Sequence, residues 1–208
     1  NSIMAGTFPS TAGFQTLDFT SNTNTRVSVS VSGKTQRLQT GSQYWSFTLK
    51  SPKKDRADVL EDYAFLVTQN GQTESFTIVP PVVTDARGTA SGTITVANHT
   101  SVSPLMSLAA GSKNIGVSGG SGTLKKGDLI KFSNHDKVYM ITEDANLDGS
   151  TIDQLSFFPP LTTALTGGGQ TITYDNVPFK VYLTGDNIQY KSSTDGKFQY
   201  QIKVNEEI

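Results

Sequence analysis

Hydrophobic and polar residues alternate along most of this chain, in the manner of β-strands. The pattern is clearest in residues 43–50, where Trp45, Phe47 and Leu49 are separated by serine, threonine and lysine. A period of two places alternate side chains on opposite faces of a strand, so one face is dry and the other wet. We therefore predict a strand here whose aromatic side is buried.

One segment has a helical period instead. Four apolar residues recur at three- and four-residue steps: Val59, Tyr63, Leu66 and Val67. This spacing places them on one stripe of a helix. Asp55 is the expected N-cap, and Asn70-Gly71 is typical of a left-handed helix end. We predict one amphipathic helix, followed by a strand over residues 74–81.

The segment before the aromatic strand predicts a hairpin. Residues 26–31 alternate valine with polar residues, residues 32–35 have the composition of a turn, and residues 36–38 begin a second strand. We expect the three valines of this hairpin to point inward.

The amino-acid composition of the chain changes after Pro80-Pro81. Residues 92–122 are rich in small residues, and short strands alternate with turns about every ten residues from 124 to 174, which is typical of a small barrel or sandwich. Residues 179–183 and 198–204 alternate again, and we expect them to rejoin the first sheet. The prediction is a mainly β protein: a β-sandwich or split-barrel domain with one amphipathic α-helix (residues 1–84 and 179–208) and an inserted small β-barrel domain (residues 85–178).

Composition narrows the range of functions. The chain has 208 residues, with 17 basic and 18 acidic side chains, so a basic face for nucleic-acid phosphates is not indicated. It has no cysteine, which excludes disulfides and thiolate metal sites. Neither a run of eighteen apolar residues nor a secretory signal is present, so we expect no membrane span and synthesis in a cytoplasm.

The strongest metal candidate is the loop that begins at Asp144. Asp144, Asn146, Asp148 and Gly149 match the first half of a calcium loop. The twelfth position, which needs a bidentate carboxylate, is Leu155. A polar turn between two strands explains the same residues, so we assign no metal ligand and leave metal binding by the Asp144–Asp148 loop open.

Catalytic and cofactor motifs are not recognisable in the sequence. His99 and His135 lie in turn-like contexts, and His135-Asp136 lacks a serine in a strand-to-helix elbow. The glycine runs at 119–122 and 167–169 lead into no helix, so they predict turns, not phosphate loops. Adjacent carboxylates, Glu61-Asp62 and Glu206-Glu207, are expected on solvated faces. We predict no catalytic residue, no cofactor and no enzymatic activity.

Aromatic residues leave one alternative function open. Trp45 and Tyr44, with Tyr190 or Tyr200, could form a sugar-stacking platform in a carbohydrate-binding or adhesive β-module. The alternation of Trp45 with Phe47 favours a core position instead. A basic patch at residues 53–56 is expected to be a solvated face or a subunit contact.

Several segments together resemble structural proteins of bacteriophage tails. They are Phe8-Pro-Ser-Thr-Ala-Gly-Phe14, the aromatic strand Tyr44–Leu49, the helix Arg56–Leu66, the segment Gly71–Pro81, and the barrel-like segments Leu124–Phe132, Val138–Thr142 and Phe157–Leu161. The chain is similar to tail-hub, distal-tail and baseplate-type ring proteins. The resemblance implies a homo-oligomeric ring in the virion tail, either hub, distal-tail or adaptor, that docks neighbouring tail or baseplate proteins.

Overall fold

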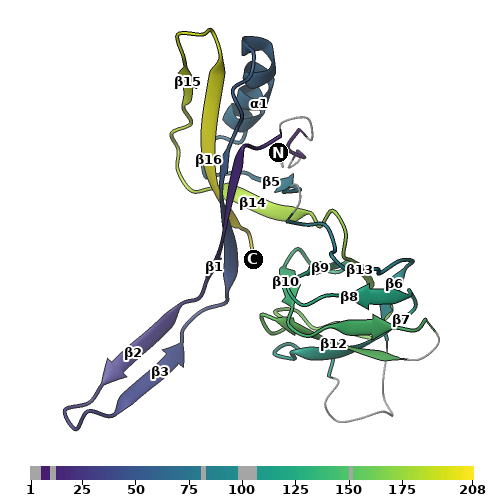
Figure 1. Ribbon diagram of the computed structural model, residues 1–208. Coiled ribbons are helices and arrows are strands. Elements are labelled where there is room, and N and C mark those ends of the chain that lie inside the picture. The colour runs from purple at the N-terminus through teal and green to yellow at the C-terminus, as the bar shows by residue number, and fades with distance from the viewer. Residues whose placement is uncertain (1–5, 10–12, 81–82, 98–106, 150–151) are drawn as a thin grey trace. The chain divides into compact units, whose positions relative to one another are not determined.

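The computed structural model describes residues 6–9, 13–80, 83–97, 107–149 and 152–208. Within these ranges the protein is mainly β with one helix, which confirms the predicted fold class (Figure 1). Two compact units are present: the sheet unit, residues 1–76 with 181–208, and the barrel unit, residues 77–180. No helix in the described part of the chain is long and apolar enough to cross a membrane.

The main sheet joins the beginning and the end of the chain. Its strand order is β1 (Thr16–Asn22), β4 (Tyr44–Lys50), β16 (Phe198–Glu206), β14 (Phe179–Leu183) and β5 (Ser75–Ile78), and β15 (Tyr190–Ser192) also pairs with β16. The pairs β1–β4, β4–β16, β14–β16 and β15–β16 are antiparallel, and Val204 of β16 lies opposite Phe47 of β4. The C-terminal strand is therefore an inner strand of a sheet begun by the N-terminal segment.

The dry face of this sheet is aromatic. Trp45, Phe47 and Leu49 are all buried, as the alternation of β4 predicts. On the neighbouring strand, the ring of Phe19 stacks on that of Trp45 with 4.6 Å between centroids. Contacts of this kind exclude water from both rings, so Trp45 is a core residue.

The helix α1 (Arg56–Thr68) begins and ends where the sequence predicts. Asp55 is the N-cap residue, although its carboxylate makes no capping bond, and Asn70 and Gly71 have positive φ of 54° and 66°. A Cβ at Gly71 would lie 2.6 Å from a carboxylate oxygen of Asp186, so this position needs glycine.

The buried stripe of α1 differs from the predicted one. Val59 and Leu66 are fully buried, but Val67 is 51% exposed, so its assignment to the inner stripe is wrong. Asp62 and Gln69 are buried in its place. The stripe includes these polar residues because hydrogen bonds satisfy them: Asp62 accepts one from the Tyr200 hydroxyl, and Gln69 donates one to the Phe65 carbonyl.

The first hairpin is a separate ribbon, formed by β2 (Thr25–Val29) and β3 (Thr35–Gln39), which pair only with each other among the described strands (Figure 1). We call these strands and their turn, residues 30–34, the arm. Every side chain of both strands is exposed, and Val31 in the turn is fully exposed. The prediction of inward-facing valines is therefore wrong, because none of the described residues forms a second layer against which the ribbon could bury them.

The barrel unit is a closed barrel of six strands. Their order is β10 (Val138–Ile141), β12 (Asp153–Phe158), β7 (Asn114–Ser118), β6 (Ile94–Val96), β13 (Thr171–Thr173) and β9 (Leu129–Phe132). A short ribbon of β8 (Gly122–Leu124) and β11 (Ala145–Leu147) accompanies it. The core combines aliphatic side chains with Phe132, Tyr139 and Phe157, all almost completely buried. Closure leaves a barrel without free strand edges.

Candidate interaction surfaces

The loop at Asp144 is held by lysines. One oxygen of the Asp144 carboxylate accepts the backbone N–H of Lys126 at 2.9 Å, and the other accepts the Lys125 ammonium at 2.9 Å. These two hydrogen bonds hold the pKa of Asp144 below its ordinary value, and the bond from the Lys126 N–H has the larger effect. Asn146 lies in β11, where the backbone is extended and cannot wrap an ion. The described residues contain no group of three or more His, Asp or Glu side chains that could hold a metal ion.

Asp128 and Arg87, which no sequence motif marks, hold the same turn from a second side. The buried carboxylate of Asp128 accepts the backbone N–H groups of Lys125, at 2.8 Å, and of Arg87, at 3.2 Å. The Arg87 guanidinium lies 3.3 Å from the same carboxylate and donates to the Lys126 carbonyl. The bonds of Arg87 connect segments 39 to 41 residues apart, and together with the Lys125–Asp128 bond they account for the Lys-Lys-Gly-Asp run as a structural turn.

His135 is hydrogen-bonded in the barrel unit. Its Nε2 lies 2.8 Å from the Tyr139 hydroxyl, which also accepts the Thr162 N–H, and its Nδ1 lies 2.7 Å from the side-chain oxygen of Asn134. Burial lowers the pKa of His135, and it outweighs the opposing effect of Asp136. Asp136 pairs with Lys131 at 2.8 Å. The carboxylate therefore does not orient the imidazole, and the triad arrangement is not formed. His99 lies outside the described residues.

The glycine runs form turns. Gly119, Gly120 and Gly122 have positive φ, as do Gly167, Gly168 and Gly169. A Cβ at Gly122 would lie 2.2 Å from the carbonyl oxygen of Thr89, so the strand pair needs glycine there for close approach. Neither run leads into a helix, which agrees with the prediction of turns.

The paired carboxylates are divided between surface and interior. Glu61 is exposed, but Asp62 and Glu206 are buried, so the expectation of solvated faces is wrong for the latter two. Asp62 accepts the Tyr200 hydroxyl at 2.8 Å and the Lys54 ammonium at 3.2 Å. Burial raises the pKa of Tyr200, and the hydrogen bond to Asp62 adds to the effect. Glu206 accepts the backbone N–H of Trp45. Both carboxylates thus stabilise the sheet unit.

The aromatic residues do not form an exposed platform. Trp45 and Tyr200 are buried, Tyr44 is half-buried, and Tyr190, which is 38% exposed, packs edge-on against Tyr63. A sugar-stacking surface needs ring faces open to solvent. The described rings therefore favour the core role for Trp45.

The basic patch at residues 53–56 is largely neutralised. Lys53 pairs with Asp195 at 3.2 Å, and Lys54 with the buried Asp62. The Asp55 carboxylate lies 2.7 Å from the Lys197 ammonium. The pairs Lys53–Asp195 and Asp55–Lys197 connect the start of the helix to the turn between β15 and β16.

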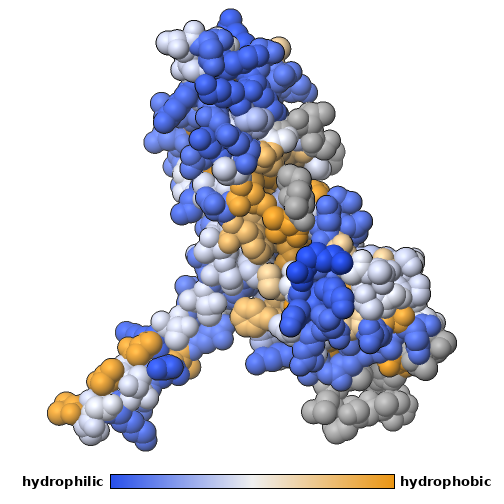
Figure 2. Space-filling view, viewed as in Figure 1, coloured by the Kyte–Doolittle hydropathy of each residue, from blue (hydrophilic) through white to orange (hydrophobic). Residues whose placement is uncertain are grey.

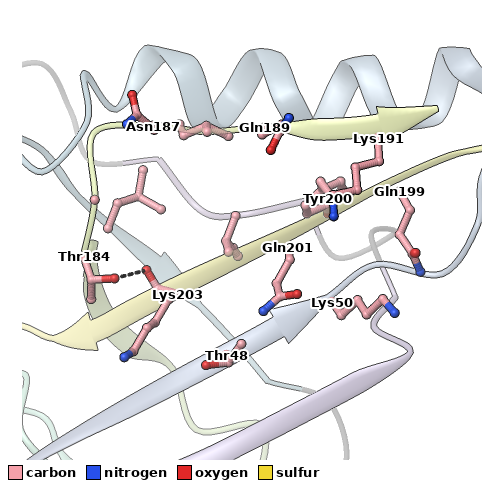
Figure 3. Close-up of a pocket in the computed structure, with 14 residues that line it drawn as sticks. Thr48, Lys50, Thr184, Asn187, Gln189, Lys191, Gln199, Tyr200, Gln201 and Lys203 are labelled. Carbon is pink, nitrogen blue, oxygen red and sulfur yellow. Dashed lines mark hydrogen bonds between the residues drawn. The ribbon is translucent and has the colours of Figure 1, made fainter.

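The opposite face of the sheet is polar and carries a groove. Asp18, Thr48 and Lys203 lie side by side on three adjacent strands, β1, β4 and β16. Between β16 and the segment 184–191 is a cavity of about 540 Å³ (Figure 3). Its polar lining residues come from β4, β15, β16 and this segment: Thr48, Lys50, Thr184, Asn187, Gln189, Lys191, Gln199, Gln201 and Lys203. The alternation of β4 predicts a wet face, but the groove depends on the 184–191 connection, which the pattern does not reveal.

The arm combines apolar and basic side chains. Val27, Val29 and Leu38 are 58%, 65% and 65% exposed, and apolar patches are visible along the ribbon in the space-filling view (Figure 2). Arg26 and Arg37 lie directly opposite Leu38 and Val27 on the partner strand. Exposed apolar groups beside charges are typical of a surface that contacts another macromolecule.

The features assembled in the described residues are a buried core, a wet sheet face and an exposed arm. These described residues form no group of three or more potential metal ligands. The class that they define is a two-unit β protein whose exposed surfaces are suited to contacts with other proteins.

The barrel unit resembles a domain of a known protein family. Residues 93–177 match the family model described as "Distal tail protein pb9, B domain", over less than half of the chain. The match confirms the resemblance to a tail protein of tailed bacteriophages. It supports a structural role, a location in the virion tail and contacts with other tail proteins. No curated protein matches the chain.

Proposed function

We propose that this protein is a non-enzymatic structural component of a phage tail, of hub, distal-tail or adaptor type, that self-assembles into a closed ring and docks neighbouring tail or baseplate proteins. The match of residues 93–177 to a distal tail domain supports the tail assignment. The observation that carries self-assembly is the arm, whose strands are exposed on every side chain.

An isolated two-stranded ribbon is at best marginally stable in water. The arm has five residue pairs and no supporting layer within the described chain. A partner that covers the apolar side chains of the arm supplies the missing layer and stabilises the ribbon. Contacts between different surfaces of identical subunits close into a ring when the rotation is suitable, and ring closure also protects free strand edges such as that of β1.

The two parts of the chain have different tasks in this proposal. Residues 1–84 and 179–208 form the ring, and the inserted residues 85–178 contact neighbouring tail or baseplate proteins. The polar face of the main sheet, with Asp18, Thr48 and Lys203 in one row, suits the wall of a water-filled channel. The protein is made in the host cytoplasm and is incorporated into the virion tail.

The test is the mass of the purified protein, from light scattering after size exclusion, with negative-stain images of the peak. The chain has a mass of 22.3 kDa, and we expect a peak at a fixed multiple of this value with ring-shaped particles. A single 22.3 kDa species at every concentration would contradict self-assembly. The barrel unit is tested separately, by binding of the purified protein to purified neighbouring tail proteins.

A further inference from the structure

One face of the arm has a defined pattern of apolar and basic side chains. Val27 lies directly opposite Arg37, and Val29 lies opposite Thr35. Directly opposite residues of an antiparallel pair share a face, so these four side chains form one surface. We call it the valine face. It is exposed throughout.

The outer face of α1 has the matching pattern. Leu60, Ala64 and Val67 recur at four- and three-residue steps, and all three are exposed. This spacing forms a second apolar stripe, on the side of the helix that is not packed on the sheet unit. Glu61 borders the stripe and is exposed.

The charges of the two surfaces are complementary. The chain has no acidic residue between Asp18 and Asp55, so the arm carries only the positive charges of Arg26, Lys34 and Arg37. The exposed charged residues of α1 are Arg56, Asp58 and Glu61, which are net negative. Each surface has an apolar row beside a charge of opposite sign, so docking pairs the charges while it buries the apolar groups.

The dimensions of the two surfaces also agree. Val27 and Val29 are two residues apart on a strand, about 7 Å. Leu60 and Ala64 are four residues apart on a helix, about 6 Å along its axis. The five residues of β2 extend about 16 Å, and the thirteen residues of α1 about 20 Å. A strand laid along the helix therefore keeps its valines in register with the stripe.

The occupant is a second copy of the chain. The arm leaves the sheet at the Tyr44 end of β4, whereas α1 follows the Lys50 end. These ends are six residues apart, or about 20 Å. Among the described residues of one chain the arm makes no contact that buries its side chains, and both surfaces remain exposed together. A contact between these two surfaces would therefore join two copies of the chain.

We propose that the valine face of the arm (Val27, Val29 and Arg37) of one subunit docks on the outer stripe of α1 (Leu60, Ala64 and Val67, with Glu61) of the next subunit. This inference rests on the proposed self-assembly and specifies its interface. The two surfaces differ, so the contact is head-to-tail, and each subunit offers one arm and receives another. Repetition of such a contact closes a ring.

The barrel unit is less suited than α1 to receive the valine face of the arm. Its exposed large apolar side chains, among the described residues, are Ile152 and Phe158. They lie six residues apart, Ile152 just before β12 and Phe158 at its end, with an exposed Gln154 between them. They form no continuous row, and a valine pair about 7 Å apart cannot contact both.

Cysteine cross-linking tests the contact, and the natural chain has no cysteine to interfere. A chain with both Val27→Cys and Leu60→Cys, treated with a mild oxidant, should give a disulfide-linked ladder that ends at the ring mass. Each single variant should give dimers at most. A disulfide requires Cα atoms within about 7 Å, so the ladder reports direct contact. The matched control combines Val27→Cys with Ser192→Cys, an exposed position outside α1, and should give no ladder.

Charge reversal provides a second test. Arg37→Glu alone and Glu61→Arg alone should each weaken assembly about tenfold, and the double variant should restore it. Arg37→Glu combined with Asp18→Arg, on the polar face of the sheet, is the control and should not restore it. Each variant should keep the unfolding midpoint of the parent, since both side chains are exposed.

The outcomes separate this inference from the proposed function. A ring of the expected mass whose double-cysteine variant gives no ladder would overturn the arm-to-helix contact and leave self-assembly intact. Restoration by Asp18→Arg in place of Glu61→Arg would move the acceptor to the sheet face and also overturn it. A protein that stays at 22.3 kDa at every concentration would overturn self-assembly and this contact together.

Discussion

Two strands of the sheet unit, β4 and β2, share the same alternation of apolar and polar residues but differ in burial. Phe47 and Trp45 of β4 are buried, whereas Val27 and Val29 of β2 are more than half exposed. β4 lies between β1 and β16 in the main sheet, while β2 pairs with β3 alone. Alternation therefore determines which residues share a face, and the neighbouring layer determines whether that face is buried.

The difference has an energetic meaning. Burial of a large apolar side chain contributes about 1.5–3 kcal/mol. β4 gains this stabilisation within one chain. The valines of β2 gain it only when another molecule covers them, so stability of the single chain and stability of an assembly are encoded in different strands.

The largest expected effect comes from truncating the buried row. Phe47→Ala should lower the free energy of unfolding by about 3–5 kcal/mol, because it removes a fully buried ring and leaves a cavity. The matched substitution Val29→Ala in the arm should change it by less than about 0.5 kcal/mol. Denaturant titration of both variants under conditions that keep the chain monomeric measures the contrast. Similar losses for both would show that the arm is packed in the monomer.

The second prediction compares two adjacent carboxylates of α1. Asp62→Ala should lower the free energy of unfolding by about 3 kcal/mol, because it leaves the Tyr200 hydroxyl and the Lys54 ammonium without their buried partner. Glu61→Ala, one residue earlier and exposed, should cost less than about 0.5 kcal/mol in the monomer. Thermal or denaturant unfolding measures both. An equal cost at the two positions would contradict the buried network.

The sequence predicts local features of this fold more completely than distant ones. The strand β4, the helix ends at Asp55 and Asn70-Gly71, and the mainly β class follow from period, capping residues and composition. The burial of Val67 was predicted wrongly because the inner stripe of α1 includes Asp62. A buried carboxylate depends on partners far away in sequence, here Tyr200, and no local pattern reveals them.

The surfaces were predicted less well for the same reason. The exposed valines of the arm have the pattern of an ordinary amphipathic hairpin, and only the missing second layer makes them a contact surface. The polar groove requires the 184–191 connection to lie beside β16. The His135 environment was similarly hidden, since Tyr139 and Thr162 come to it from different segments.

A pH effect should distinguish the barrel unit from the sheet unit. Both histidines, His99 and His135, fall in the barrel range, and the folded-state pKa of His135 is lowered by burial. The unfolded chain then binds a proton first as pH falls, so stability of the barrel unit should decrease below about pH 6.5, down to the lowered pKa. Unfolding midpoints of the wild type between pH 7.5 and 5.5 measure the loss, which we expect to be smaller than that of either core substitution.

The control for this effect is His135→Gln, which should flatten the pH dependence without changing the sheet unit. A stability that rises as pH falls through the same window would contradict the lowered pKa, because it requires the folded state to bind the proton more tightly.

The smallest expected change in monomer stability belongs to the arm, where the double substitution Val27→Thr and Val29→Thr keeps the branched shape and the strand preference but removes apolar surface. The free energy of unfolding of the monomer should stay within about 0.5 kcal/mol of the parent value, since solvent already covers both side chains. Assembly should nevertheless be lost, because the apolar contribution of each valine is realised only between subunits. Sedimentation velocity over a concentration series, beside a denaturant titration, measures both quantities on one preparation. A variant that still assembles as the parent does would show that the valines are not at the interface, and the exposed row of β2 would then need another explanation than a missing layer.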